Sequence, residues 1–199
     1  MPGLRAGLRK LAGAWSALLL GIVIVALAAA GPGLTDGLRF ERAAIADGEL
    51  WRLVSGHIVH LGMAHAALNA AGLVLIVWLV GREYTLRQWL LVSAITVAAI
   101  DVGLWWLVPE LQWYVGLSGV LHGWLAAGVV AQVRRRRPDA FLLATLLCGK
   151  LVFEGLFGAL PGSVEAAGGP VVVEAHLYGT AGGVLSGLLL IRFVRDRRL

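Results

Sequence analysis

Charged residues and cysteine are both scarce in this sequence. Only 15% of its 199 residues are Asp, Glu, Lys or Arg, and 59% are hydrophobic, whereas ordinary soluble domains carry roughly 25% charged residues. So little charge cannot cover a water-facing surface, which makes soluble enzymes, disordered chains and nucleic-acid binders poor fits despite a pI near 10.1. The one cysteine, Cys148, excludes an intramolecular disulfide and a cysteine-cluster metal site. With a mean hydropathy of +0.82, the sequence indicates a polytopic membrane protein.

Long apolar runs take the place of the missing charge. A bilayer core of about 30 Å needs roughly 20 residues of helix, and membrane β-strands would be shorter and alternate in polarity. We therefore predict an all-α polytopic membrane protein, a bundle of six transmembrane helices that forms a single domain over residues 1–199. The predicted spans are 11–30, 58–80, 88–108, 117–133, 140–160 and 174–194.

The basic residues predict the orientation of these spans. With the N-terminus inside, 13 of the 17 Lys and Arg residues fall on inner segments. The positive-inside rule therefore favours an N-in, C-in topology. The inner residues are Arg5, Arg9, Lys10, Arg82, Arg87, Arg134, Arg135, Arg136, Arg137, Arg192, Arg195, Arg197 and Arg198. The run at 134–137 lies in a short turn between two spans, which argues against a nucleic-acid surface.

Two features precede the second span. The first apolar run could be a cleaved signal peptide, but its roughly 20 residues exceed the usual 7–15 of such a segment, so we expect a retained span. The loop 31–57 contains Arg39, Arg42 and Arg52 together with four acidic residues. It is too polar to face lipid, and we expect it to pack at the outer interface.

Polar side chains inside spans are costly in lipid and are functional candidates by default. Spans two, four and six all run from outside to inside, and His60, Ser118 and His176 lie near their starts. Three helices thus bring a serine and several imidazoles to the same outer depth. The further candidates are His65, Asn69, Asp101, His122, Lys150 and Glu154.

Ser118 is flanked by glycine at the start of the short fourth span, where unpaired backbone N–H groups favour an anion. A tetrahedral oxyanion formed there would be stabilised, although serine is also a common helix cap. Gly179, Gly183 and Gly187 follow His176 at four-residue intervals, and Gly119 and Gly123 form a matching ridge in span four. Spans four and six should therefore touch and bring His176 to Ser118 as a general base. The alternative is that His176 is a polar cap.

His65 and Asn69 lie on one face of span two and could donate hydrogen bonds to such an oxyanion, or could merely join helices. His57, His60 and His65 also suggest a metal site, but they lack a His-Glu-x-x-His motif and we expect no metal.

Lys150 and Glu154 form an i,i+4 pair that we expect to be structural, with Asp101 as a further partner. A proton or ion pathway is the alternative. His122, one helical turn after Ser118, could help to position His176 or water.

The combination of these motifs resembles the rhomboid family of intramembrane serine proteases across about five of the six spans. The residues that carry the resemblance are Trp51-Arg52, His60 with His65 and Asn69, Gly116-Leu117-Ser118-Gly119, and Ala175-His176 with Gly179. The resemblance implies a catalytic dyad of Ser118 and His176 without a third acidic residue. It also implies oxyanion donors from His65, Asn69 and the Ser118 backbone, with Leu117 positioning substrate. His60, Gly116, Gly119 and His122 would then support the site.

Within that family the sequence is most similar to the rhombosortase branch. His122 stands where many rhomboids have a tyrosine that stacks on the catalytic histidine, and Glu174, Lys150 and Glu154 are also similar to that branch. The resemblance implies cleavage of exported, membrane-anchored proteins that end in a Gly-Gly motif, a hydrophobic helix and a basic tail, by hydrolysis or by transfer to an amine. It implies a bacterial inner membrane, a site open to the periplasmic side, and no cofactor.

Three other functional hypotheses remain. One is a general rhomboid protease that cleaves transmembrane substrates. Another is a non-catalytic rhomboid-like binding protein, although such proteins usually lose the serine or the histidine. A small transporter using Asp101, Lys150 and Glu154 is the third, and it leaves the clustering of Ser118 and His176 unexplained.

Overall fold

The computed structural model describes residues 2–193, with side chains from 16 to 192. The chain is mostly helical in this part. Its principal helices are α1 (Pro2–Ala29), α5 (Met63–Val80), α6 (Leu86–Leu107), α7 (Ser118–Arg134), α8 (Pro138–Phe157) and α10 (Val173–Leu190). The short elements are α2 (Pro32–Leu38), β1 (Phe40–Glu41), α3 (Arg42–Ala46), α4 (Arg52–Ser55), β2 (Trp113–Tyr114), α9 (Ser163–Ala167) and the 3₁₀ turn Ile191–Phe193. Of the predicted inner residues, Arg195, Arg197 and Arg198 lie outside the described residues, as does the end of the predicted span 174–194.

Three helices within the described residues, α5, α6 and α8, are long and apolar enough to cross a membrane. A fourth candidate is the pair Ser16–Ala29 and Pro32–Leu38, which bends by 115° at its break. Helices α7 and α10 occupy the predicted fourth and sixth spans with 17 and 18 residues. The chain is thus a helical membrane protein, while the count of six spans and the N-in, C-in topology stay predictions.

The start of the second predicted span needs correction. Helix α5 begins at Met63 instead of residue 58, so His60 lies in the turn before the helix. Tertiary hydrogen bonds hold this turn away from helical geometry: Thr35 Oγ1 donates to the His60 carbonyl at 3.2 Å, and the Gly116 N–H donates to the Gly56 carbonyl at 3.0 Å. The backbone groups of the turn are therefore used for contacts with distant segments.

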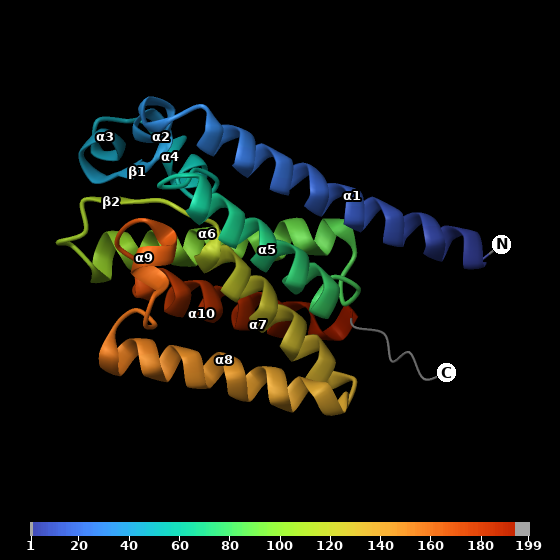
Figure 1. Ribbon diagram of the computed structural model, residues 1–199. Helices are drawn as coiled ribbons and strands as arrows, with labels where there is room; N and C mark the ends of the chain where they lie inside the picture. The colour runs from blue at the N-terminus through green and yellow to red at the C-terminus, as the bar shows by residue number, and fades with distance from the viewer. Residues whose placement is uncertain (1, 194–199) are drawn as a thin grey trace.

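The arrangement of the bundle is visible in Figure 1. Helix α7 packs against α5, α6, α8 and α10, whereas α1 lies along α5 on one flank and α8 forms the opposite flank. The short elements gather at one end of the bundle, and the first residues of α1 and the end of α10 lie at the other. The starts of α7 and α10 share the end with the short elements, so Ser118 and His176 lie at the same depth.

Helices α7 and α10 meet through their glycines, as the small-residue spacing predicts. A Cβ atom added to Gly119 would lie 2.8 Å from the Ala175 carbonyl oxygen, and one added to Gly123 would lie 2.7 Å from that of Gly179. Side chains at these positions would force the two backbones apart. The predicted contact between spans four and six is confirmed.

The segment 31–57 folds into short elements that join the ends of the helices. Strand β1 pairs antiparallel with β2, with Phe40 opposite Tyr114. The Arg42 guanidinium donates at 2.8–3.0 Å to four backbone carbonyls, three in the last turn and C-cap of α6 and one, that of Leu111, in the segment after it. Because the last carbonyls of a helix lack intrahelical partners, Arg42 serves as a C-terminal cap for α6. Buried Arg52 likewise bonds to the Asp36 and Arg39 carbonyls and to the Glu49 carboxylate.

At the opposite end, two arginines of the run 134–137 have acidic partners. Arg135 binds the buried Glu83 carboxylate, and Gln132 on α7 donates to the Leu79 carbonyl at 2.9 Å. Arg137 pairs with Asp139 at the surface. These contacts tie the turn after α7 to the end of α5.

Candidate active site

Ser118 is the first residue of α7, and the turn before it determines where its hydroxyl lies. Gly116 has φ +120°, a conformation that a side-chain-bearing residue rarely adopts. A Cβ atom there would also lie 2.9 Å from His65 Cε1. Leu117 follows as the N-cap, with its side chain buried in the apolar core. Gly116 and Leu117 thus shape the turn before Ser118, but Leu117 is not among the residues that line the cavity beside Ser118. The predicted roles of both residues stay predictions.

His176, in the first turn of α10, meets Ser118. Its Nε2 lies 2.9 Å from Ser118 Oγ, and the residue is only 4% exposed. The close α7–α10 packing at Gly119 and Gly179 makes this approach possible. The geometry is that of a hydroxyl hydrogen-bonded to a potential general base.

His122 stacks on His176 from within α7. The ring centroids are 4.2 Å apart and the planes are inclined by 18°. His122 Nδ1 lies 2.7 Å from the Ser118 carbonyl oxygen, and since a carbonyl only accepts, Nδ1 carries the donated proton. This bond holds the His122 ring flat against that of His176.

Two polar side chains of α5 face the same space. The Leu61 N–H donates to His65 Nδ1 at 3.4 Å, so a neutral His65 carries its proton on Nε2. Asn69 Nδ2 donates to the His65 carbonyl at 3.1 Å. Both residues line one cavity with Ser118. The donors near an oxyanion at Ser118 are the His65 Nε2–H, the second N–H of the Asn69 amide and the backbone N–H of Ser118 at the start of α7.

The structure adds an acidic residue to the pair. Glu154 Oε2 lies 3.0 Å from His176 Nδ1, and Glu154 Oε1 accepts from Lys150 Nζ at 2.5 Å. The predicted Lys150–Glu154 pair is therefore present, and its contact with His176 is what the sequence reasoning missed. The sequence did contain one signal for this contact. Glu154 lies near the end of the fifth predicted span that the predicted topology places outside, level with the starts of spans four and six.

These side chains share a cavity of about 290 Å³. The polar part of its lining consists of the side chains described above, and the rest of its lining on α5 and α7 is apolar. The apolar wall residues are Leu68, Gly72, Leu75, Ile76, Leu121 and Leu125, with Leu160, Ala167 and Val171 from the segments after α8. Such a mixture suits an apolar chain whose backbone reaches a small polar centre.

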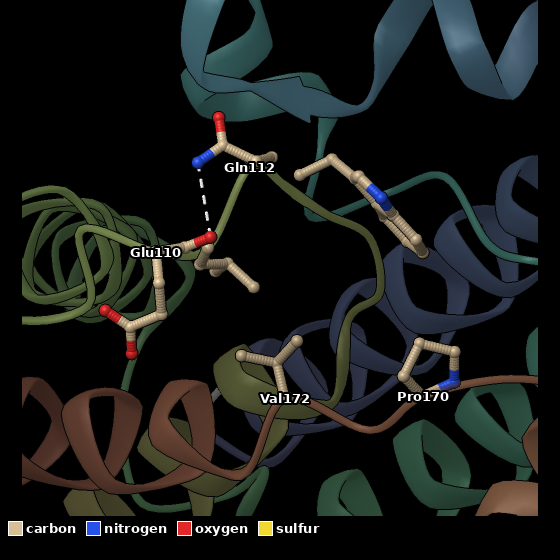
Figure 2. A pocket seen from close by; sticks show the side chains of 6 residues that line it. Glu110, Gln112, Pro170 and Val172 are labelled. Atoms are coloured by element: carbon tan, nitrogen blue, oxygen red, sulfur yellow. Dashed lines mark hydrogen bonds between the residues drawn. The ribbon is translucent and has the colours of Figure 1, made fainter.

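A second cavity of about 300 Å³ lies between the segment after α6 and the segment before α10, with Glu110 and Gln112 facing Pro170 and Val172 (Figure 2). Gln112 Nε2 donates to the Glu110 carbonyl at 3.2 Å. Its lining contains one carboxylate, Glu110, and neither a serine nor a histidine. The reactive groups are therefore gathered in the first cavity.

Other buried polar residues lie apart from Ser118. His57 Nε2 donates to Asp101 Oδ1 at 3.1 Å, so Asp101 is not the predicted partner of Lys150 and Glu154. His60 packs edge-on against His65 with ring centroids 4.9 Å apart. Burial, with the neighbouring His65 adding to it, lowers the pKa of His60 to about 4, which keeps this ring neutral. His60 thus contacts the site through His65, and its supporting role stays a prediction.

One group of side chains has metal-ligand geometry. Ligand atoms of His122, Glu154 and His176 lie within 4.8 Å of one another. This is a different set from His57, His60 and His65, which the sequence suggested. The Lys150 ammonium lies 3.3 Å from His176 Nδ1, where its charge would oppose a cation. The donor set fits an ion-pair and hydrogen-bond network better than a metal.

Fold and site together define a helical membrane protein with a serine–histidine pair in a cavity at one end of its bundle. The family model described as "Rhomboid domain" matches residues 47–193. The chain therefore belongs to the rhomboid family, a family of intramembrane proteases.

Two relatives from Bacillus subtilis (strain 168) show the same similarity. The chain is 24% identical to "Putative rhomboid protease YdcA" over 154 residues, which cover 77% of this chain and 73% of that protein. It is 26% identical to "Rhomboid protease GluP" over 150 residues, which cover 75% of this chain but only 28% of GluP. The residues that match the family model include both Ser118 and His176.

Proposed function

We propose that this protein is an intramembrane serine endopeptidase of the rhombosortase type, with Ser118 as nucleophile and His176 as general base. The observation that carries the proposal is the 2.9 Å contact between Ser118 Oγ and His176 Nε2 inside a cavity with apolar walls. A serine hydroxyl is a weak nucleophile without such a base.

The reaction follows from the positions of these groups. Ser118 Oγ attacks the scissile carbonyl while His176 Nε2 takes the hydroxyl proton. The oxyanion is stabilised by the Ser118 N–H, by His65 Nε2–H and by the Asn69 amide. His176 then donates its proton to the leaving amine, and water or a second amine releases the acyl group from Ser118.

The proposed substrates are exported proteins with a C-terminal Gly-Gly motif, a hydrophobic helix and a basic tail. A hydrophobic helix suits the bilayer beside the cavity, and a Gly-Gly segment is extended easily because it carries no side chains. The basic tail would stay on the inner side under the proposed N-in, C-in orientation, which leaves the Gly-Gly segment at the outer, periplasmic side.

A fluorophosphonate probe tests the nucleophile first. Membranes with the wild-type chain should be labelled, and Ser118→Ala and His176→Ala should not be, at equal expression and equal thermal stability. Labelling that persists in Ser118→Ala contradicts the assignment.

Substrate specificity is tested with a tailed reporter and a matched reporter in which Gly-Gly is replaced by Ala-Ala. We expect cleavage of the first and little of the second. The mass of the new C-terminus distinguishes hydrolysis from transfer to an amine.

A general rhomboid protease is the second candidate, and the relatives named as rhomboid proteases favour it. It predicts equal cleavage of the two reporters. The non-catalytic reading does not account for the hydrogen bond between Ser118 and His176. The transporter reading does not account for Asp101 and Glu154 bonding to different histidines. Ion flux in vesicles unaffected by Ser118→Ala would support a transporter.

A further inference from the structure

Glu154 is bonded in a way that constrains the imidazole of His176. It is 4% exposed, and its two carboxylate oxygens have different partners: Oε2 contacts His176 Nδ1 at 3.0 Å and Oε1 accepts from Lys150 at 2.5 Å. A buried carboxylate without partners would be very costly, so these two contacts account for its presence.

The contact with Glu154 decides which ring nitrogen of His176 carries a proton. An ionised carboxylate only accepts hydrogen bonds, so Nδ1–H donates to Glu154 and Nε2 is left as an acceptor. Nε2 is the atom that faces the Ser118 hydroxyl. The carboxylate therefore selects the tautomer that can receive the serine proton, and it favours the imidazolium that forms afterwards.

Lys150 acts on the same carboxylate from the other side. Its Nζ lies 3.3 Å from His176 Nδ1. Since neither an ammonium nor Nδ1–H can accept a hydrogen bond there, this proximity is electrostatic and opposes the imidazolium. The other titratable groups that face His176 are His65 of α5 and His122 of α7.

We propose that Glu154 is a positioning residue that extends Ser118 and His176 to a hydrogen-bonded triad, with Lys150 limiting the basicity of His176 through the shared carboxylate. This inference rests on the proposed roles of Ser118 and His176. It departs from the dyad that the family resemblance implies, because it adds a third, acidic residue, which α8 contributes.

The pH dependence of fluorophosphonate labelling tests the proposal without a known substrate. The acid limb of the labelling rate reports protonation of the base. Glu154→Gln should slow labelling by about 10²- to 10⁴-fold and move the limb to lower pH by about one unit. Lys150→Met should move it to higher pH, because the carboxylate then acts on His176 alone. Glu154→Asp, which keeps the charge, should leave the limb closer to that of the wild type.

A purely structural anchor for α8 predicts a different pattern. Glu154→Gln and Lys150→Met would then both lower thermal stability and leave the acid limb of the labelling rate at its wild-type pH. Leu147→Ala is the matched control, because it removes a buried apolar contact of α8 without changing charge. The proposal is overturned if the acid limb stays at its wild-type pH in both Glu154→Gln and Lys150→Met, or if it moves in the same direction in both.

A readout independent of activity separates this inference from the proposed function. In ¹⁵N-histidine-labelled full-length protein, the signal of His176 is assigned by its loss in His176→Ala. Its titration midpoint should fall in Glu154→Gln and rise in Lys150→Met. If the wild type is not labelled by the probe, the proposed function fails while this titration still decides the role of Glu154. Unchanged midpoints overturn that role.

Discussion

The imidazole of His122 lies parallel to that of His176, with ring centroids 4.2 Å apart and an interplanar angle of 18°. His122 is fixed in this position by its own bond to the Ser118 carbonyl. His122 thereby contacts the ring of His176 and the backbone of Ser118, and it stands where many rhomboids have a tyrosine.

His122→Ala should lower the labelling rate of Ser118 by up to about tenfold, since aromatic stacking contributes about 0.5–1.5 kcal/mol. His122→Phe, which keeps the stacked ring but loses the bond to the carbonyl, should retain more activity than alanine. Labelling kinetics at equal thermal stability measure both. An alanine variant with wild-type labelling and stability would reject a positioning role for His122.

Removal of an oxyanion donor should affect the chemical step more than binding. His65→Ala should lower kcat for a cleaved reporter by about 10²- to 10³-fold, as expected for one oxyanion-hole donor. Leu68→Ala, at the exposed wall of the same cavity, is the control and should mainly change KM. Equal effects of the two variants on kcat would show that His65 serves packing alone.

The glycine contact between α7 and α10 should be intolerant of a methyl group. Gly123→Ala would place a Cβ atom 2.7 Å from the Gly179 carbonyl oxygen, and overpacking of this kind typically costs about 1–3 kcal/mol. We expect a lower thermal midpoint in detergent and loss of labelling. Gly155→Ala on α8 meets no atom within 4 Å and should be neutral or slightly stabilising. Similar midpoints for the two variants would contradict the packing argument.

Arg42 should be a stability residue. Arg42→Met leaves several carbonyls at the end of α6 without a donor, at a cost of about 1–3 kcal/mol for a buried group. Arg39→Met removes more exposed ion pairs and should cost less. Thermal unfolding compares the two, and labelling per folded molecule should change little in either. A larger loss in Arg39→Met would exclude the capping role.

His60 should make stability depend on pH. Its pKa of about 4 in the folded chain lies below the usual value of 6.5, because burial disfavours the charged ring. The unfolded chain therefore binds a proton first as pH falls, and stability should decrease between about pH 6.5 and 4. His60→Leu should flatten this part of the curve, measured as thermal midpoint against pH. A curve of unchanged slope would show that other groups cause the acid sensitivity.

Much of the fold follows from local sequence. Long apolar runs predict helices because every backbone polar group in lipid must be satisfied within its own segment. Four-residue spacing of glycines predicts the α7–α10 contact, and that contact predicts that His176 meets Ser118. The predicted start of span two at 58 was wrong because hydrogen bonds to Thr35 and to the segment before Ser118 hold residues 56–62 in a turn.

The sequence by itself determined that this chain is a helical membrane protein with a serine and a histidine at one depth, since hydropathy and periodicity are local properties. Only the tertiary structure decided which charges meet. His176 pairs with Glu154 at a separation of 22 residues, His57 with Asp101 at 44, and Arg42 with carbonyls 62 to 69 residues away. No helical period relates such positions, because these partners are brought together by the packing of separate helices and loops.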